Sequence, residues 1–191
     1  MQDILFYINQ GLNHVLDWAA YDHILFLIVL IIVFSFSDWK KTLWLITFFT
    51  IGHTITLALS AYNIIQINSE VTEFLIAATI FITALSNILF QRNKGSINLN
   101  LFFALFFGLI HGLGFSSYFK MLVGHTDDKI IPLFSFAIGV ELAQAIIVIV
   151  LLTIALVFAK LFKISKRDWV LVLSAIVVGI ILPILKDRIF W

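Results

Sequence analysis

The sequence has 191 residues, of which 62% are hydrophobic and only 12% are charged, and its mean hydropathy is +1.09. A soluble domain is typically about 45–50% apolar and about 25% charged, so this composition excludes an ordinary soluble protein and is typical of a polytopic membrane protein. The net charge of +1 comes without a basic run that would bind nucleic acid, and the absence of cysteine excludes disulfides and thiolate metal sites. We expect a single transmembrane domain over 1–191.

The first predicted element covers residues 3–19. Apolar residues recur at helical spacing on one face, while Asn9, Asn13 and Asp17 lie on another. The stretch is too short and too polar to cross a bilayer comfortably. It therefore predicts a short amphipathic helix lying in the membrane interface.

Six apolar runs follow. The length of each is close to that of a helix that crosses a bilayer, which needs about 20 residues. We place them at about 22–38, 42–62, 71–91, 99–120, 130–160 and 168–186. The expected fold class is therefore all-α, a polytopic membrane bundle of about six transmembrane helices plus the N-terminal interfacial helix. The fifth run is longer than a perpendicular span needs, so we expect it to be tilted or to extend beyond the membrane.

The charges of the connections predict the orientation of the bundle. The connections after the first, third and fifth runs hold eight of the twelve lysines and arginines. The positive-inside rule makes these connections cytoplasmic. Both termini are then expected to face the outside or the periplasm.

The fourth run carries the most informative residue, His111, in the middle of the apolar stretch from Leu99 to Phe119. An ionisable residue inside a membrane is costly and points to a functional site. Gly108, Gly112 and Gly114 surround it in sequence, and the Gly-x-x-x-Gly spacing allows the backbones of two helices to approach closely. We expect these glycines to serve helix packing.

Other polar residues fall at similar predicted depths. With a rise of about 1.5 Å per residue, His53, His111 and Glu141 lie near the middle of their helices. Asp22, His23 and Glu73 begin the first and third runs, and are expected at the outer mouth. The supporting candidates, on the same helix faces or on the polar face of the first helix, are Thr50, Gln144, Asn87 and His14. His125 is expected in an exposed loop, without a functional role.

This set of residues leaves several functions open. Imidazole with carboxylate suits Ni²⁺, Co²⁺, Zn²⁺ or Fe²⁺, and the absence of cysteine argues against a Cu(I) path. The same groups could relay protons, or could hold a zinc ion that activates water for hydrolysis inside the membrane. A third reading is a scaffold whose polar core only fixes helix packing.

Four sequence blocks in order, at 21–27, 49–57, 107–115 and 139–144, are YDHILFL, FTIGHTITL, FGLIHGLGF and GVELAQ. Together they resemble the HupE/UreJ family of small bacterial membrane proteins. The resemblance implies a permease or accessory protein for nickel, or cobalt, linked in some bacteria to hydrogenase or urease. Family members often carry a histidine seven residues before that of the Asp-His pair. This chain has Leu16 there, which weakens the case for His14 as a ligand.

We therefore expect a multi-pass protein of the bacterial inner (cytoplasmic) membrane that moves a divalent transition metal ion inward. Nickel is the first expectation, with cobalt, zinc or iron as alternatives. The expected partners are the lipid bilayer, the metal ion and metallo-enzyme maturation proteins, with no nucleic acid and no catalytic residue. The alternatives are an intramembrane zinc hydrolase and a scaffold. The expected metal residues are Asp22, His23, His53, His111 and Glu141, with Gln144 orienting Glu141.

Overall fold

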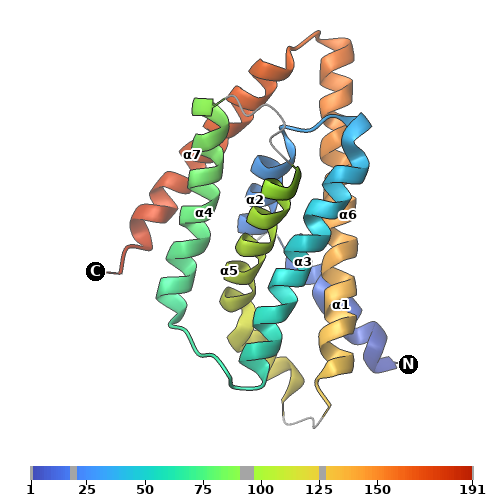
Figure 1. The fold of residues 1–191 in the computed structure, drawn as a ribbon, viewed down its shortest axis with the longest axis vertical. Coiled ribbons are helices and arrows are strands. Elements are labelled where there is room, and N and C mark those ends of the chain that lie inside the picture. The colour runs from blue at the N-terminus through green and yellow to red at the C-terminus, as the bar shows by residue number, and fades with distance from the viewer. Residues whose placement is uncertain (1, 18–20, 91–96, 125–127, 191) are drawn as a thin grey trace.

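The computed structural model describes residues 2–17, 21–90, 97–124 and 128–190. Within these ranges all the regular elements are helical, which confirms the all-α class (Figure 1). They are α1 (Gln2–Leu16), α2 (Tyr21–Ile31), a short 3₁₀ helix (Phe36–Asp38), α3 (Trp39–Ala61), α4 (Ser69–Phe90), α5 (Ile97–Val123), α6 (Ile130–Leu161) and α7 (Lys166–Asp187). Five of these, α3 to α7, are long and apolar enough to cross a membrane, and α1 with α2 meet the same criterion together, as a broken span or a re-entrant loop.

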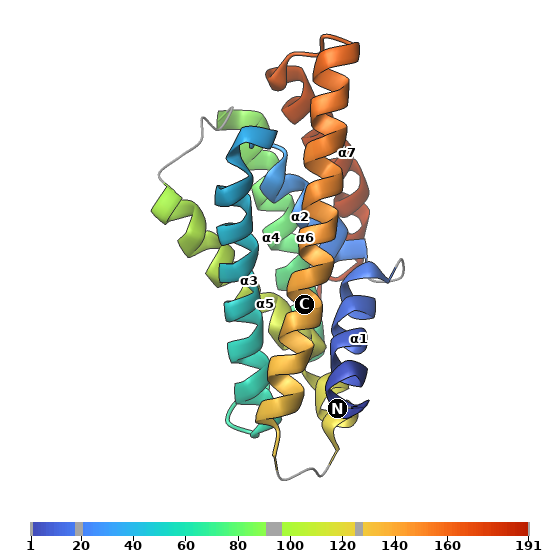
Figure 2. The same ribbon diagram turned by 90° about the vertical axis from the view of Figure 1, so that its right-hand side faces the viewer.

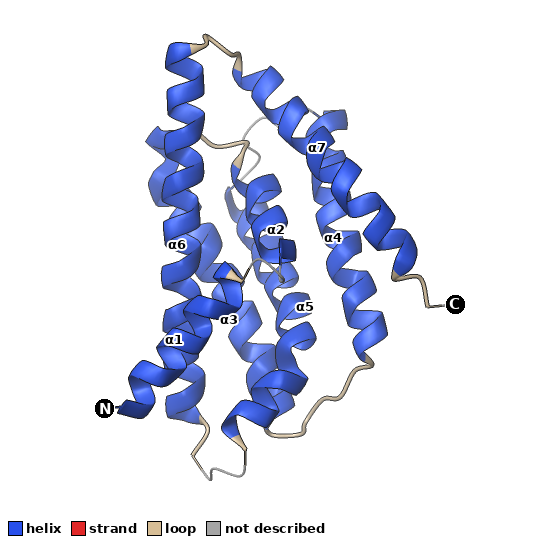
Figure 3. Ribbon diagram, turned by 180° about the vertical axis from the view of Figure 1, so that it is seen from behind, coloured by secondary structure: helices blue, strands red, loops and turns tan. Residues whose placement is uncertain are grey.

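The five long helices alternate in direction along the bundle. The end of α3 and the start of α6 lie at the lower end in Figure 1, whereas α6 and α7 are joined at the upper end. In both Figure 1 and Figure 2, α1 lies in the lower half of the molecule and α2 in the upper half. Seen from behind, α1 and α6 form one side, α4 and α7 form the other, and α2 lies between them (Figure 3).

The first apolar run differs from its expected form. The stretch 22–38 was expected to be one span, but α2 ends at Ile31, and its 11 residues rise only about 16 Å. The backbone N–H of Ser35 donates to Asp38 Oδ2 over 3.1 Å, and this local bond starts the next helical segment. The axes of α1 and α2 differ by 71°, so a half-length helix pair takes the place of one straight span.

Two glycines bring α1 against α6. A Cβ atom added at Gly139 would overlap the carbonyl oxygen of Ile8, and one added at Gly11 would overlap that of Phe136. Such close backbone contact between helices is possible only with glycine at the crossing point. The first helix, expected at the membrane interface, is therefore packed along α6.

Glycines also allow close backbone contact between α3 and α5. A Cβ atom at Gly108 would overlap the carbonyl oxygen of Phe49, and one at Gly52 would overlap that of Leu105. A Cβ atom at Gly112 would meet the carbonyl oxygen of His53. These crossings lie within four residues of His53 and His111, so they set the separation of the two histidine-bearing helix segments.

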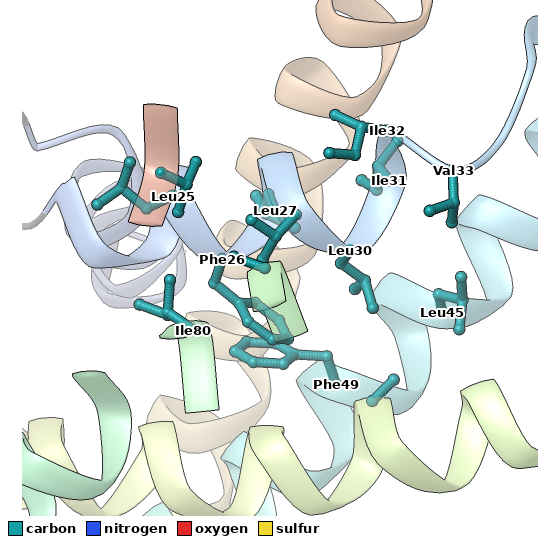
Figure 4. Packing of buried hydrophobic residues seen from close by; sticks show 14 of the residues in the cluster. Leu25, Phe26, Leu27, Leu30, Ile31, Ile32, Val33, Leu45, Phe49 and Ile80 are labelled. Carbon is teal, nitrogen blue, oxygen red and sulfur yellow. The ribbon is translucent and has the colours of Figure 1, made fainter. Parts of the chain in front are cut away.

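Helix α2 is enclosed by its neighbours (Figure 4). Phe26 is fully buried, and its ring stacks on that of Phe49 with the centroids 4.9 Å apart. Leu27 and Ile31 are also almost fully buried, and Ile80 of α4 belongs to the same cluster. Because other helices surround α2, it needs no full membrane thickness of its own.

Candidate metal site

Four imidazoles from four helices meet inside the bundle. His14 lies in the last turn of α1, His23 in the first turn of α2, His53 within α3 and His111 within α5. The ring centroids of His14 and His23 are 4.5 Å apart, and His14 to His53 and His23 to His111 are each 5.7 Å. One ring nitrogen from each of His14, His23 and His53 lies within 4.8 Å of the other two. We call these four residues the histidine cluster.

Each member of the histidine cluster has a buried nitrogen without a hydrogen-bond partner. The atom is Nε2 in all four residues, among the part of the chain that the structure describes. A buried polar atom that makes no hydrogen bond costs about 1–3 kcal/mol, so four in one place need an explanation. An ion held between the nitrogens of His14, His23 and His53 would satisfy three of them, and His111 lies next to this group.

The other ring nitrogen has a hydrogen-bond partner in His111 and a nearby carboxylate in His23, where the geometry is not that of a hydrogen bond. His111 Nδ1 lies 2.9 Å from the carbonyl oxygen of Phe107. Since a carbonyl only accepts, Nδ1 carries the proton and Nε2 keeps its lone pair. His23 Nδ1 lies 3.0 Å from Asp22 Oδ1. A carboxylate or carbonyl behind a histidine is the usual partner that orients a metal ligand and raises its basicity.

Aromatic rings close the site on several sides. The His111 centroid lies 5.0 Å from that of Phe26 and 5.1 Å from that of Phe49. The His14 ring lies 3.7 Å from the ring of Phe115. These apolar walls keep the nitrogens away from bulk water, and electrostatic interactions are stronger in such surroundings.

A cavity of about 730 Å³ leads to the histidine cluster. His14, His23 and His111 line it, while His53 lies behind them and is 1% exposed. The cavity reaches the surface at Glu73, whose side chain is 55% exposed and lies 3.8 Å from Arg188. Asp17 and Asp22 also line the cavity, which gives it more acidic than basic groups. A cation therefore has a polar route from one end of the bundle to the imidazoles.

Glu141 forms a separate polar group between α3 and α6. Its Oε1 accepts a hydrogen bond from the Thr47 hydroxyl over 2.6 Å, and its Oε2 lies 2.5 Å from the Thr50 hydroxyl. The same Thr50 hydroxyl is 3.0 Å from Gln144 Oε1. Thr50 precedes His53 by three residues on α3, so this group lies about one helical turn beyond the histidine cluster.

Asn87 and Gly114 take part in contacts between helices. The amide of Asn87 donates to the carbonyl oxygen of Val29 over 2.8 Å and ties α4 to α2. A Cβ atom at Gly114 would meet the Ile76 side chain rather than a backbone. His125 lies outside the described residues.

The sequence predicted Glu141 in one site with His53 and His111, whereas the structure holds it on Thr47 and Thr50. Two further points differ. Sequence reasoning ranked His14 below the other histidines, yet the structure places this ring against His23. It also passed over Thr47, although Thr47, Thr50 and His53 recur every three residues and therefore share one face of α3. This spacing is the sequence feature that could have identified Thr47.

Comparisons with curated proteins and with solved structures found no match. A family model described as HupE / UreJ protein matches residues 1–185, essentially the whole chain. The match covers all four helices that carry the histidine cluster as well as the Glu141 group. The chain therefore belongs to the HupE/UreJ family.

Proposed function

We propose that this protein moves a divalent transition metal ion, nickel or cobalt, across the membrane through the histidine cluster. The observation that carries the proposal is the four buried Nε2 atoms, from four different helices, at the inner end of a polar cavity. Neutral imidazole is the commonest metal ligand, and nitrogen ligands suit Ni²⁺, Co²⁺ and Zn²⁺. The association of the HupE/UreJ family with nickel and cobalt supports this choice of cargo.

Asp22 would act through His23 rather than as a direct ligand. Its Oδ1 lies 3.0 Å from His23 Nδ1 and accepts the backbone N–H of the same residue over 2.9 Å. In this position the carboxylate orients the imidazole and leaves Nε2 for the ion. Replacing such a partner typically lowers metal affinity about 10–100-fold.

The Glu141 group would serve the ion after it leaves the imidazoles. Thr50 and Thr47 continue the polar face of α3 away from the cavity, and Glu141 of α6 accepts a hydrogen bond from each, so the group supplies oxygen atoms. The sequence contains no phosphate-binding loop, so the driving force would be the membrane potential, a proton gradient or a cytoplasmic sink for the ion. A potential of 100 mV contributes about 2.3 kcal/mol per elementary charge, hence about twice that for a divalent ion.

The proposal is tested by measuring nickel uptake into vesicles that contain the purified protein, together with nickel binding by calorimetry. His23→Ala and His53→Ala should each lower nickel affinity by more than about tenfold. His125→Ala is the matched control, because the sequence predicts this histidine in an exposed loop, and it should bind and transport like the wild type.

Two results would contradict transport. Nickel or zinc that binds to the wild-type protein but never crosses the membrane would favour the intramembrane hydrolase. A wild-type protein that binds no divalent metal at all would favour the scaffold.

A further inference from the structure

A second cavity, of about 130 Å³, lies near the end of the bundle where α6 and α7 are joined, far in sequence from the histidine cluster. Its walls come from the segment after α2, the last turns of α6 and the first turn of α7. Most of the lining is apolar, as with Ile32, Phe34 and Leu156, and the polar lining residues are Ser35, Lys166 and Trp169. We call this cavity the α6–α7 pocket.

Trp169, which lines the α6–α7 pocket, carries an unused hydrogen-bond donor. Trp169 Nε1 is buried and has no partner among the described residues. An indole nitrogen can only donate, so this atom calls for an acceptor such as a phosphate or carbonyl oxygen. Lys166 Nζ donates to Ser35 Oγ over 3.1 Å, which fixes a positive charge at the pocket and joins α7 to the segment before α3.

The surroundings of the pocket are strongly basic. Lys160, Lys163, Lys166 and Arg167 all fall within eight residues at the junction of α6 and α7. Asp168, the acid that follows this stretch, accepts a hydrogen bond from the Ser165 hydroxyl over 2.7 Å. Its backbone N–H donates to the same hydroxyl oxygen over 3.1 Å. Basic clusters directly beside a membrane helix attract anionic lipid headgroups, and tryptophan is enriched at this level of the bilayer.

We propose that the α6–α7 pocket binds an anionic phospholipid. A phosphate oxygen accepts the Trp169 indole N–H beside the Lys166 ammonium, and the first part of one acyl chain lies on the apolar wall that includes Phe34 and Leu156. A lipid held there touches the segment before α3, α6 and α7 together. This inference does not depend on metal transport, because the pocket shares no lining residue with the metal cavity.

The test measures binding of phosphatidylglycerol and of phosphatidylcholine to the purified full-length protein in detergent, by native mass spectrometry and by the rise in melting temperature. The wild type should bind phosphatidylglycerol more tightly than phosphatidylcholine. Trp169→Phe keeps an aromatic ring at this position and removes the N–H, and should weaken phosphatidylglycerol binding about tenfold or more, the value of one hydrogen bond to a charged group. Trp44→Phe, an exposed tryptophan on α3, is the matched control and should bind like the wild type.

A further variant keeps both polar groups and fills the pocket instead. Ala159 lines the pocket and is exposed, so Ala159→Phe adds volume without removing any packed side chain. It should also weaken phosphatidylglycerol binding. Equal binding of the two lipids by the wild type, or equal losses in Trp169→Phe and Trp44→Phe, would overturn the proposal. Inorganic phosphate that competes with phosphatidylglycerol at equal concentration would show a simple anion site and would overturn the lipid assignment.

Discussion

Gly108→Ala should destabilise the protein and damage the metal site together. The added methyl group would overlap the carbonyl oxygen of Phe49, which is backbone and cannot rotate away. Helices α3 and α5 would have to separate at a crossing three residues before His111 and four residues before His53. Both imidazoles should then move apart.

The size of the effect follows from a comparison with a second glycine. Adding a methylene to a closely packed region costs about 1–3 kcal/mol. Alanine is also the better helix former, by about 1 kcal/mol, which partly offsets that cost. At Gly179 of α7 nothing lies within 4 Å of an added Cβ atom, so Gly179→Ala keeps the gain without the cost. The two variants should differ in free energy of unfolding by about 1–3 kcal/mol.

Unfolding in detergent micelles measures this difference, and calorimetry with nickel measures the site. Gly108→Ala should unfold at lower denaturant concentration than Gly179→Ala and bind nickel more weakly than the wild type. If the two alanine variants have the same free energy of unfolding, the close contact of α3 with α5 does not require glycine at position 108. If Gly108→Ala is destabilised but binds nickel normally, the crossing does not set the positions of the imidazoles.

Three further predictions concern the polar core and the topology. His14→Ala and His23→Ala should each remove most nickel binding. The double variant should lose little more, because the ligands that remain after either single substitution no longer hold the ion. Additive losses measured by calorimetry would contradict a shared site. Thr50→Val removes the hydroxyl that bonds Glu141 and should cost about 1–3 kcal/mol in thermal unfolding, whereas Thr50→Ser should be nearly neutral. A reporter active only in the cytoplasm, fused after Trp191, should give no signal, and a strong signal there would reverse the predicted orientation.

The long helices could be predicted closely from the sequence, because length and hydropathy are local properties. The expected runs for α3, α4, α6 and α7 agree with the structure to within three residues at either end. The first run could not be delimited in this way. Its apolar residues continue past Ile31, where α2 ends, and the bond between Ser35 and Asp38 begins a separate short helix.

The arrangement of the histidines depends on tertiary packing. Estimating depth from the position of a residue in its apolar run assumes that each run starts at a membrane surface. On this assumption His23 is expected at the outer mouth. In the structure α1 occupies the lower half of the bundle, so the start of α2 lies deeper, beside His14 and His111. That position follows from the close contacts that Gly11 and Gly139 allow between α1 and α6. The local sequence does not show which helix a glycine will contact.

The meeting of two half-length helices at the cavity also has an electrostatic consequence. The last turn of α1 and the first turn of α2 both line the cavity. A helix carries about half a negative elementary charge at its carboxyl end and about half a positive one at its amino end. At α2 the carboxylate of Asp22 accepts a backbone N–H and offsets the positive end, while the carbonyl end of α1 lies beside His14. The two backbone ends roughly offset each other, and the carboxylate of Asp22 makes the junction negative overall. Broken helices in transporters use their ends to hold ions, and a negative junction of this kind would favour a cation over an anion.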